Sequence, residues 1–322
     1  MTDDLRDDAT DDDMEDLDIP DVAPYAIALF ADMAARGAGA ESMDPEMLRE
    51  VREAPYLISK IAALTTDALL VRLRALGLTV TTDRFAAETA DLDSAWTLGE
   101  RWCERVDTSL EAARRDPVWT DLVCLAACEL WKRWQPERPS DEMLEDLIQV
   151  GLEADREEDF ATTCEHWLKV WGLLVARVTP GRPFILPPSF YDWLFELGPS
   201  FLAASMDAPE YIDKGIALLR DVLARLPDTD AGIHAELGFY VIELLLADDR
   251  LDEALAVAHA RAEAAPQHIS GHVWAISILK ESGQAGQALT AMRTLMQQDL
   301  EGAEDWDLEG LLAELETLAA RS

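Results

Sequence analysis

Two stretches of the chain, Leu246-Ala-Asp-Asp-Arg-Leu-Asp-Glu-Ala-Leu255 and Lys280-Glu-Ser-Gly-Gln-Ala-Gly-Gln-Ala-Leu289, share one local pattern. Ala254 and Ala288 hold equivalent places in the two stretches and lie 34 residues apart. A period of that length is typical of helix–turn–helix units, each too small to bury its apolar face alone. The sequence therefore predicts helix pairs stacked side by side, an arrangement that forms an extended surface for holding other proteins.

The helix-pair pattern extends on both sides of these stretches, over residues 140–322. The expected pairs are about 140–152 with 158–178, 189–205 with 209–226, 231–247 with 251–265, and 268–282 with 285–298. Residues 179–188 contain four prolines, which exclude a helix there. A last helix, about 304–320, is Leu-rich on one side and acidic on the other, as expected of a helix that caps a repeat array.

The first part of the chain divides into a tail, residues 1–20, and a helical region, residues 21–139. The tail carries ten acids and one base, so its charges repel one another and too little apolar area opposes them. In the helical region, Asp44-Pro45 and Thr66-Asp67 are typical helix starts and Gly77 a typical helix end. No alternating β-branched pattern of useful length occurs. We expect an all-α protein, an α-α superhelix with an N-terminal helical region and a disordered acidic tail.

The charge is the most unusual feature of the composition. Among 322 residues, 64 Asp and Glu oppose 27 Lys and Arg, a formal net charge of −37. Such a chain repels phosphate backbones and anionic lipid, which disfavours direct binding to nucleic acid or to a membrane surface. Three interpretations remain: a basic protein partner, mimicry of a nucleic acid, or an acidic bias shared by the host's whole proteome.

The sequence also bears on location. Met1-Thr-Asp-Asp-Leu-Arg6 lacks the basic and apolar regions of a signal peptide, and no apolar run is long enough for a membrane span. We therefore expect a cytoplasmic protein.

The C-terminal half resembles tetratricopeptide repeat (TPR) proteins. The resemblance rests on the turn Glu281-Ser282-Gly283, on the small residues Ala254 and Ala288 in the second helix of each pair, and on Pro266. It covers residues 210–300 closely and 141–209 more loosely, and the turn at Asp249 departs from it because glycine is missing there. The resemblance implies a concave face, lined by the first helix of each pair, that docks a protein or peptide.

A fainter resemblance covers residues 56–175. The runs Leu64-Thr-Thr-Asp-Ala-Leu-Leu70 and Cys164-Glu-His-Trp-Leu-Lys-Val-Trp171 look like those of helical bacterial proteins that often carry a Cys-rich, zinc-binding SEC-C segment. The present sequence has no such segment, so we carry over no metal site, and the resemblance implies no known activity.

Patterns that would support catalysis or metal binding are weak. His268 and His272 are four residues apart, but the residues between them supply no Glu general base. No Gly-rich phosphate loop or nucleophile motif occurs, and four cysteines in apolar settings are typical of buried, reduced thiols. We expect a protein that is not an enzyme and has no cofactor. A helical enzyme remains the third hypothesis, which a deep pocket with a strongly perturbed carboxylate or histidine would favour.

The leading hypothesis is thus a non-catalytic interaction module that binds a protein or peptide, with a basic partner favoured by the charge. Trp193 follows the proline-rich break beside Phe190, Tyr191 and Phe195, and we interpret it as part of an exposed groove. The alternative for it, as for the other nine tryptophans, is packing between helices. The expected partner-binding residues are Tyr191, Trp193, Glu236, Tyr240, His272 and Glu281.

Overall fold

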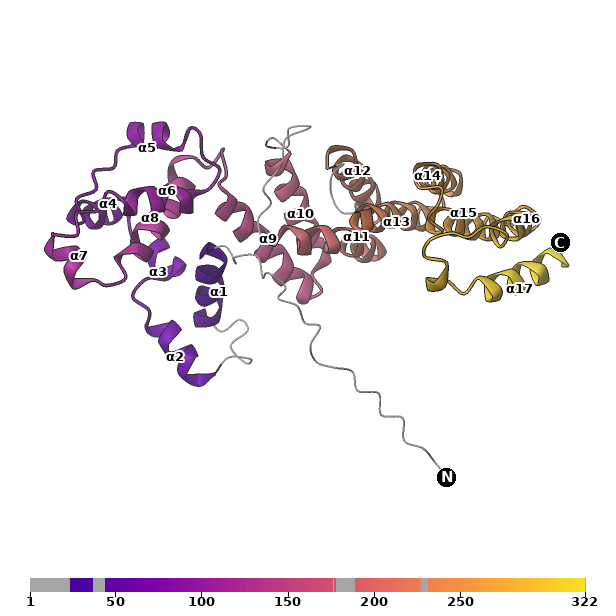
Figure 1. Ribbon diagram of the computed structural model, residues 1–322, viewed down its shortest axis with the longest axis horizontal. Helices are drawn as coiled ribbons and strands as arrows, with labels where there is room; N and C mark the ends of the chain where they lie inside the picture. Colours follow the sequence, from indigo (N-terminus) through magenta and orange to yellow (C-terminus); the bar gives the residue numbers. More distant parts are fainter. Residues whose placement is uncertain (1–23, 37–43, 176, 178–188, 227–230, 322) are drawn as a thin grey trace, which may run out of the picture. The chain divides into compact units, whose positions relative to one another are not determined.

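The computed structural model describes residues 24–36, 44–175, 177, 189–226 and 231–321 (Figure 1). The expected tail, 1–20, and the proline-rich break, 179–188, lie outside these residues. Regular structure in the described part is helical, apart from one isolated parallel bridge between His268 and Glu301. The expectation of an all-α protein is therefore confirmed.

The contacts divide the chain into two units, residues 1–146 and 147–322. The sequence had suggested a division at 139/140; the contacts place it a few residues later, inside helix α9 (Asp141–Arg156). Each unit is described by itself.

Unit 1 is built around helix α8, which is apolar on most of its circumference and is largely buried. Helices α3, α4 and α6 pack against it, and α6 makes the most extensive of these contacts. The rings of Trp102, Trp131 and Trp134 all meet Phe85 edge to face, a geometry that aromatic pairs prefer. The helices of this unit before α9 are α1 (Pro24–Arg36), α2 (Pro45–Glu53), α3 (Ile58–Ala62), α4 (Thr66–Ala75), α5 (Thr82–Thr89), α6 (Ala95–Cys103), α7 (Glu111–Arg115) and α8 (Trp119–Trp134).

The start of α6 is held by Glu142 of α9. The buried carboxylate of Glu142 accepts hydrogen bonds from the hydroxyl of Ser94 (2.7 Å) and from the backbone N–H groups of Ala95 (2.8 Å) and Trp96 (2.9 Å). The first N–H groups of a helix have no partner within the helix, and its N-terminus carries partial positive charge. The Glu142 carboxylate therefore accepts hydrogen bonds from these N–H groups and also offsets the positive charge at the start of α6.

Unit 2 is a succession of helices in which each packs against the next along the chain. Helix α11 also packs against α13, one helix further on. The bounds agree closely with the expected helix pairs. After α9 the helices are α10 (Phe160–Leu174), α11 (Phe190–Asp207), α12 (Glu210–Arg225), α13 (Ala231–Ala247), α14 (Leu251–Ala264), α15 (Ser270–Glu281), α16 (Ala285–Leu295) and α17 (Leu308–Ala319).

Three of the turns between paired helices share one backbone geometry. Glu158, Asp249 and Gly283 each adopt a left-handed conformation, with φ of 60°, 55° and 75°. After each, an amide donates to the carbonyl five residues earlier, the pattern of a Schellman helix end. These bonds join Asp159 to Ala154 (2.9 Å), Arg250 to Leu245 (2.8 Å) and Gln284 to Leu279 (2.9 Å). Asp249 thus takes the conformation of Gly283, 34 residues later, although it lacks the glycine that makes this conformation easy.

Small side chains occupy buried positions of α14 and α16, the second helices of the last two expected pairs. Ala254 and Ala288 are fully buried, as expected from the repeated pattern, and Ala258 is fully buried as well. Larger side chains fill the start of the unit, where Trp193 contacts the rings of Trp167 and Trp171. Packing between helices therefore accounts for these tryptophans.

Candidate functional site

Six carboxylates from four alternate helices form the most distinctive surface of unit 2, which we call the acidic face. It consists of Asp155 (α9), Asp192 and Glu196 (α11), Glu236 and Glu243 (α13), and Glu281 (α15). Spacings of three, four and seven residues place side chains on one side of a helix, so Asp192 lies beside Glu196 and Glu236 beside Glu243. Helices α11 and α13 thus each carry two of these acids on one side.

The pKa shifts indicate that several of these carboxylates lie near one another. Burial, then the charges of Asp155, Asp192 and Glu236, raise the pKa of Glu196, while Arg156 opposes the shift. Burial followed by the charge of Glu281 raises the pKa of Glu243. Burial alone raises the pKa of Glu236. Like charges at this range disfavour ionisation, so the acidic face stores electrostatic repulsion in the folded chain.

Tyr240 lies among these acids. Burial and the charges of Glu236, Glu196 and Glu243 raise the pKa of its phenol, which therefore stays protonated. Its ring packs closely over Gly198 of α11 and edge-to-face against Phe239. Tyr240 therefore contributes an uncharged hydroxyl group in the middle of the acidic face.

The acidic face is not neutralised by ion pairs. Within the described residues none of its six carboxylates forms a salt bridge; Asp155 accepts a hydrogen bond from Ser200 (2.7 Å). The acids of the second helices differ, because several are paired with a base. Those pairs are Glu165–Lys214 (2.7 Å), Asp213–Arg250 (2.8 Å), Asp221–Arg225 (2.7 Å) and Glu253–Arg250 (2.9 Å). Within the described residues, the acids of the acidic face thus lack the basic partners that these acids of α10, α12 and α14 have.

Two aromatic side chains accompany the acids on α11. Tyr191 is 50% exposed and Phe195 is 44% exposed, and their four-residue spacing places them on the same side of the helix. Each is followed directly by an acid, Asp192 or Glu196. Exposed aromatic rings beside unpaired charge are typical anchor positions of an interaction surface.

The structure brings some of the expected site residues together and separates others. Glu236 and Tyr240 lie half-buried in the acidic face, and Glu281, exposed at the end of α15, acts on Glu243 there. His272 is half-buried on α15, with its Nε2 3.4 Å from the carbonyl of Pro266, and no interaction within the described residues ties it to the acidic face. Tyr191 is exposed next to Asp192, as the hypothesis requires.

The interpretation of Trp193 as an exposed groove residue was wrong. Its side chain is 0% exposed and packs between Phe190, Trp167 and Trp171. The residue lies two positions after Tyr191, so it points to the opposite side of α11 and into the core. Packing between helices, the alternative considered for it, is the correct description.

Sequence reasoning missed Asp155, Asp192, Glu196 and Glu243 as members of the surface. Their spacing on α11 and α13 is helical, yet in a chain with 64 acids such spacings are common and single out no pair. What distinguishes these acids from the others is that, within the described residues, no basic side chain of a neighbouring helix pairs with them. That property depends on the tertiary contacts.

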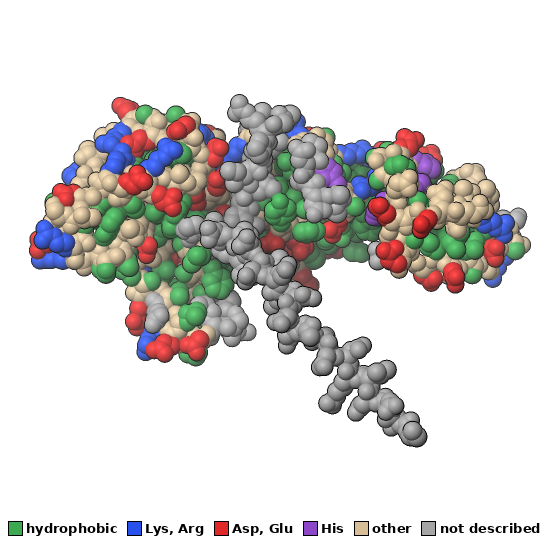
Figure 2. All heavy atoms as spheres, viewed as in Figure 1, with side chains coloured by type: hydrophobic (Ala, Val, Ile, Leu, Met, Phe, Trp, Pro, Cys, Tyr) green, Lys and Arg blue, Asp and Glu red, His purple; other side chains and the backbone are tan. Residues whose placement is uncertain are grey.

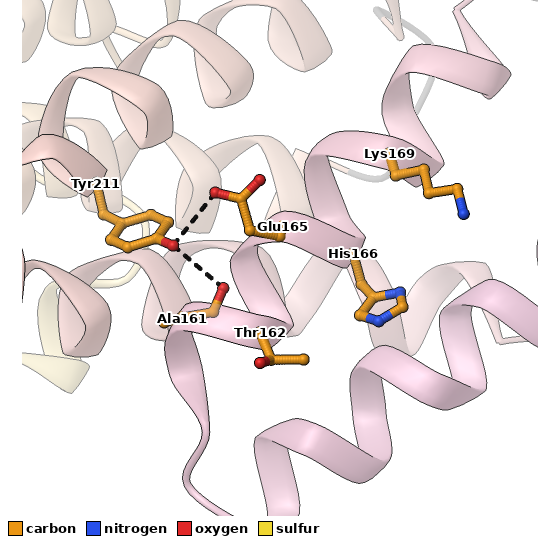
Figure 3. A pocket seen from close by; sticks show the side chains of 6 residues that line it. All are labelled: Ala161, Thr162, Glu165, His166, Lys169 and Tyr211. Atoms are coloured by element: carbon orange, nitrogen blue, oxygen red, sulfur yellow. Dashed lines mark hydrogen bonds between the residues drawn. The ribbon is translucent and has the colours of Figure 1, made fainter.

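A second feature of unit 2 is a surface hollow of about 360 Å³ on α10 (Figure 3). On one side the Tyr211 hydroxyl donates to Glu165 (3.2 Å) and to the carbonyl of Ala161 (3.4 Å). The Lys214 ammonium, 2.7 Å from Glu165, lowers the pKa of that carboxyl through a hydrogen bond. His166, whose pKa burial and nearby Lys169 lower, points away from Tyr211.

The groups of this hollow do not converge on a common point. A nucleophile and its base must lie within hydrogen-bond reach of each other, and here the histidine and the Tyr–Glu pair lie on different sides of the helix (Figure 3). The Glu165 carboxylate is already engaged by Lys214 and Tyr211. The hydrogen bonds beside this hollow thus link α10 to α12 and stabilise their packing. The acidic face is therefore the better candidate site.

The described surface is acidic well beyond this face: Figure 2 shows red carboxylates spread over each unit, with fewer blue bases among them. Across the described ranges, no cluster of three His, Cys, Asp or Glu side chains is arranged to hold a metal ion. None of the helices described is both long and apolar enough to cross a membrane. No protein-family model, no curated protein and no solved structure matches the chain.

Proposed function

We propose that this chain is a non-catalytic interaction module that binds a basic protein or peptide on the acidic face of unit 2. The observation that carries the proposal is the contrast between the two sets of helices. Several acids on the second helices are paired with bases, whereas the six acids of the acidic face form no salt bridge within the described residues, and neighbouring acids raise the pKa of Glu196 and Glu243. A cationic ligand relieves this repulsion, so binding and electrostatic complementarity act in the same direction.

In this proposal helices α9 to α16 are four pairs of a TPR-like array, capped by α17, in a cytoplasmic protein. The shared left-handed turns at Glu158, Asp249 and Gly283 support equivalent units, as does the 34-residue offset between the last two. First helices of such an array line one side, and the acidic face contains only first-helix residues.

The exposed rings of Tyr191 and Phe195 define the partner further. Charge alone gives fast, salt-sensitive and weakly selective binding, whereas aromatic anchors supply most of the affinity in typical interfaces. We therefore propose a partner that combines Lys or Arg residues with apolar side chains in one segment, such as a basic amphipathic helix.

Mimicry of a nucleic acid remains the alternative function. It requires a regularly spaced row of carboxylates and a partner that DNA displaces. On the face that Figure 2 shows, the carboxylates are spread over both units, and apolar rings have no counterpart in a phosphate backbone. These two observations favour the docking of a basic amphipathic segment.

The test uses a fluorescent 20-residue peptide of lysine and leucine with helical amphipathic spacing, and a lysine–serine peptide of equal charge. The full chain is titrated with each at 50 and 150 mM salt. We expect the lysine–leucine peptide to bind more tightly, and both affinities to fall with salt. Equal affinities for the two peptides contradict a role for the aromatic anchors.

The site itself is tested with matched triple variants. Glu196→Gln, Glu236→Gln and Glu243→Gln remove three charges of the acidic face; Glu210→Gln, Asp252→Asn and Glu263→Gln remove three exposed charges of α12 and α14. We expect the first set to weaken binding about tenfold, roughly 1.4 kcal/mol, and the second set to change it little. Equal losses in both sets reduce the effect to net charge and refute the site.

A further inference from the structure

Unit 1 contains two cysteines at the close crossing of helices α6 and α8. Gly99 of α6 touches Cys124 of α8: a Cβ at Gly99 would lie 2.5 Å from the Cα of Cys124 and 3.0 Å from its Sγ. Only glycine permits this approach, so the backbones of the two helices are nearly in contact at this point.

Cys103 lies one helical turn beyond Gly99, on the same side of α6. Its Sγ is 3.9 Å from the carbonyl of Thr120, which lies one turn before Cys124 on α8. One turn advances the chain about 5.4 Å. Cys103 and Cys124 therefore lie about one helical turn apart across this crossing, near the Cα separation of about 4.4–6.8 Å at which a disulfide forms.

The two thiols also interact directly. Cys124 donates a hydrogen bond to Cys103 and lowers its pKa, against the opposing effects of partial burial and of the carboxylates Glu100 and Asp121. The same hydrogen bond, with burial, raises the pKa of Cys124. The pKa shifts of the two thiols therefore run in opposite directions, downward for Cys103 and upward for Cys124.

The remaining cysteines lack these features. Cys128 and Cys164 are both buried; burial raises the pKa of Cys128 well above its usual value and that of Cys164 to about 12. Cysteines sensitive to oxidation are accessible, have a lowered pKa and lie beside a resolving cysteine. All four are free thiols in this structure, and Cys103 alone combines those three properties.

We propose that Cys103 and Cys124 form a peroxide-oxidisable pair that closes reversibly into a disulfide between α6 and α8. The Cys103 thiolate attacks one oxygen of a hydroperoxide, the O–O bond breaks, and Cys103 becomes a sulfenic acid, while the departing hydroxide or alkoxide takes up the proton that the Cys103 thiol released. Cys124 then attacks the Cys103 sulfur; the S–O bond breaks, the S–S bond forms, and the departing hydroxide takes up the Cys124 proton as water. With hydrogen peroxide, two thiols and one peroxide give one disulfide and two waters.

The first experiment treats the full chain with hydrogen peroxide, blocks free thiols with N-ethylmaleimide, and maps a tryptic digest without reduction. Trypsin releases Trp102–Arg105 with Cys103, and Asp116–Lys132 with both Cys124 and Cys128. We expect these two peptides to be joined, about 2 Da lighter than their sum, and separated again by dithiothreitol. Oxidation of Cys103 to a sulfinic acid without a cross-link overturns the proposal.

Variants identify the resolving residue. Cys128→Ser and Cys164→Ser should leave the cross-link at the wild-type level, whereas Cys103→Ser and Cys124→Ser should abolish it. A cross-link that survives in Cys124→Ser refutes the pairing. Because Cys124 is buried, Cys124→Ala and far-UV circular dichroism check that the loss is not caused by unfolding, and half-exposed Cys103→Ser provides the same answer independently.

The disulfide also has a stability readout that is independent of the proposed partner. Cross-linking α6 to α8 restricts the unfolded chain, so the oxidised wild type should melt at a higher temperature than the reduced form. Peroxide should not raise the melting temperature of Cys103→Ser. An equal rise in that variant assigns the effect to another site and overturns the proposal.

Discussion

The ring of Tyr240 lies directly against the backbone of Gly198, so that a Cβ on Gly198 would be 2.1 Å from the ring carbons Cγ and Cδ2. Helices α11 and α13 therefore approach each other through a glycine, and the aromatic ring fills the space that a side chain would take. This contact fixes the position of Tyr240 among the carboxylates of the acidic face.

Replacing Gly198 by alanine should therefore destabilise unit 2. The methyl group forces the ring of Tyr240 or the helix backbone to move, and overpacking of this kind costs about 1–3 kcal/mol. Chemical denaturation measures the loss. Gly172→Ala on α10 is the control, because a Cβ there meets nothing within 4 Å and should raise the stability by up to about 1 kcal/mol.

The acidic face should make stability depend on pH in a particular direction. Folding raises the pKa values of Glu196, Glu236 and Glu243, so between the ordinary and the raised values the folded state holds more protons than the unfolded state. Their contribution to the free energy of unfolding therefore falls as pH rises through that window.

The triple variant with glutamine at these three positions removes this effect. It should be more stable than the wild type at pH 7, and the difference should shrink as the pH falls and the wild-type carboxyls take up protons. Urea denaturation between pH 7 and 4.5 gives the comparison. If the Glu210, Asp252 and Glu263 variants behave identically, net charge alone explains the result.

Trp193 and Tyr191 should respond very differently to truncation. Trp193→Ala leaves a large cavity among Phe190, Trp167 and Trp171 and should cost about 3–5 kcal/mol. Tyr191→Ala removes a half-exposed ring and should change stability by less than about 0.5 kcal/mol. Thermal denaturation that ranks the two variants the other way round contradicts the buried placement of Trp193.

The Glu142 carboxylate should be an important stabilising contact of unit 1. Glu142→Ala leaves the N–H groups of Ala95 and Trp96 without their acceptor, at a cost of about 2–3 kcal/mol. Glu142→Gln keeps one acceptor oxygen and should lose less. The two free energies of unfolding, measured in urea, should therefore fall in the order wild type, glutamine, alanine.

The left-handed turn at Gly283 predicts a sharp asymmetry between neighbouring glycines. Gly283→Ala must place a side chain at a φ of 75° and should lose about 1–2 kcal/mol. Gly286→Ala, three residues later in α16, meets no atom within 4 Å and should stabilise the helix slightly. Equal effects on the melting temperature contradict the backbone description of this turn.

Helix type and helix bounds were accessible from the sequence because they depend on local signals. Gly283 and the apolar spacing after Leu251 mark the ends of α15 and the face of α14 without knowledge of distant contacts. The left-handed conformation of Asp249 was not predicted, since aspartate has no strong local preference for it. It follows from the neighbouring helices, whose packing fixes the turn.

The site was only partly predictable. The positions of Glu236 and Tyr240 follow from helical register, but the direction of Trp193 depends on which side of α11 meets the core. Tyr191 and Trp193 are close in sequence, but two residues correspond to a rotation of about 200° around the helix. One side chain therefore faces solvent and the other faces the core. Whether an acid of the acidic face has a basic partner likewise depends on the side chains of neighbouring helices.

The matching turns at Asp249 and Gly283 have a consequence for how this molecule can change in length. Residues 250–283 start directly after the left-handed residue of one turn and end at the left-handed residue of the next. The chain therefore has the same backbone conformation at both ends of this segment. Copying or excising it would rejoin the chain at an unchanged turn and in the same helical phase. A segment of this length is thus the increment by which unit 2 could be lengthened or shortened with the geometry of both turns kept.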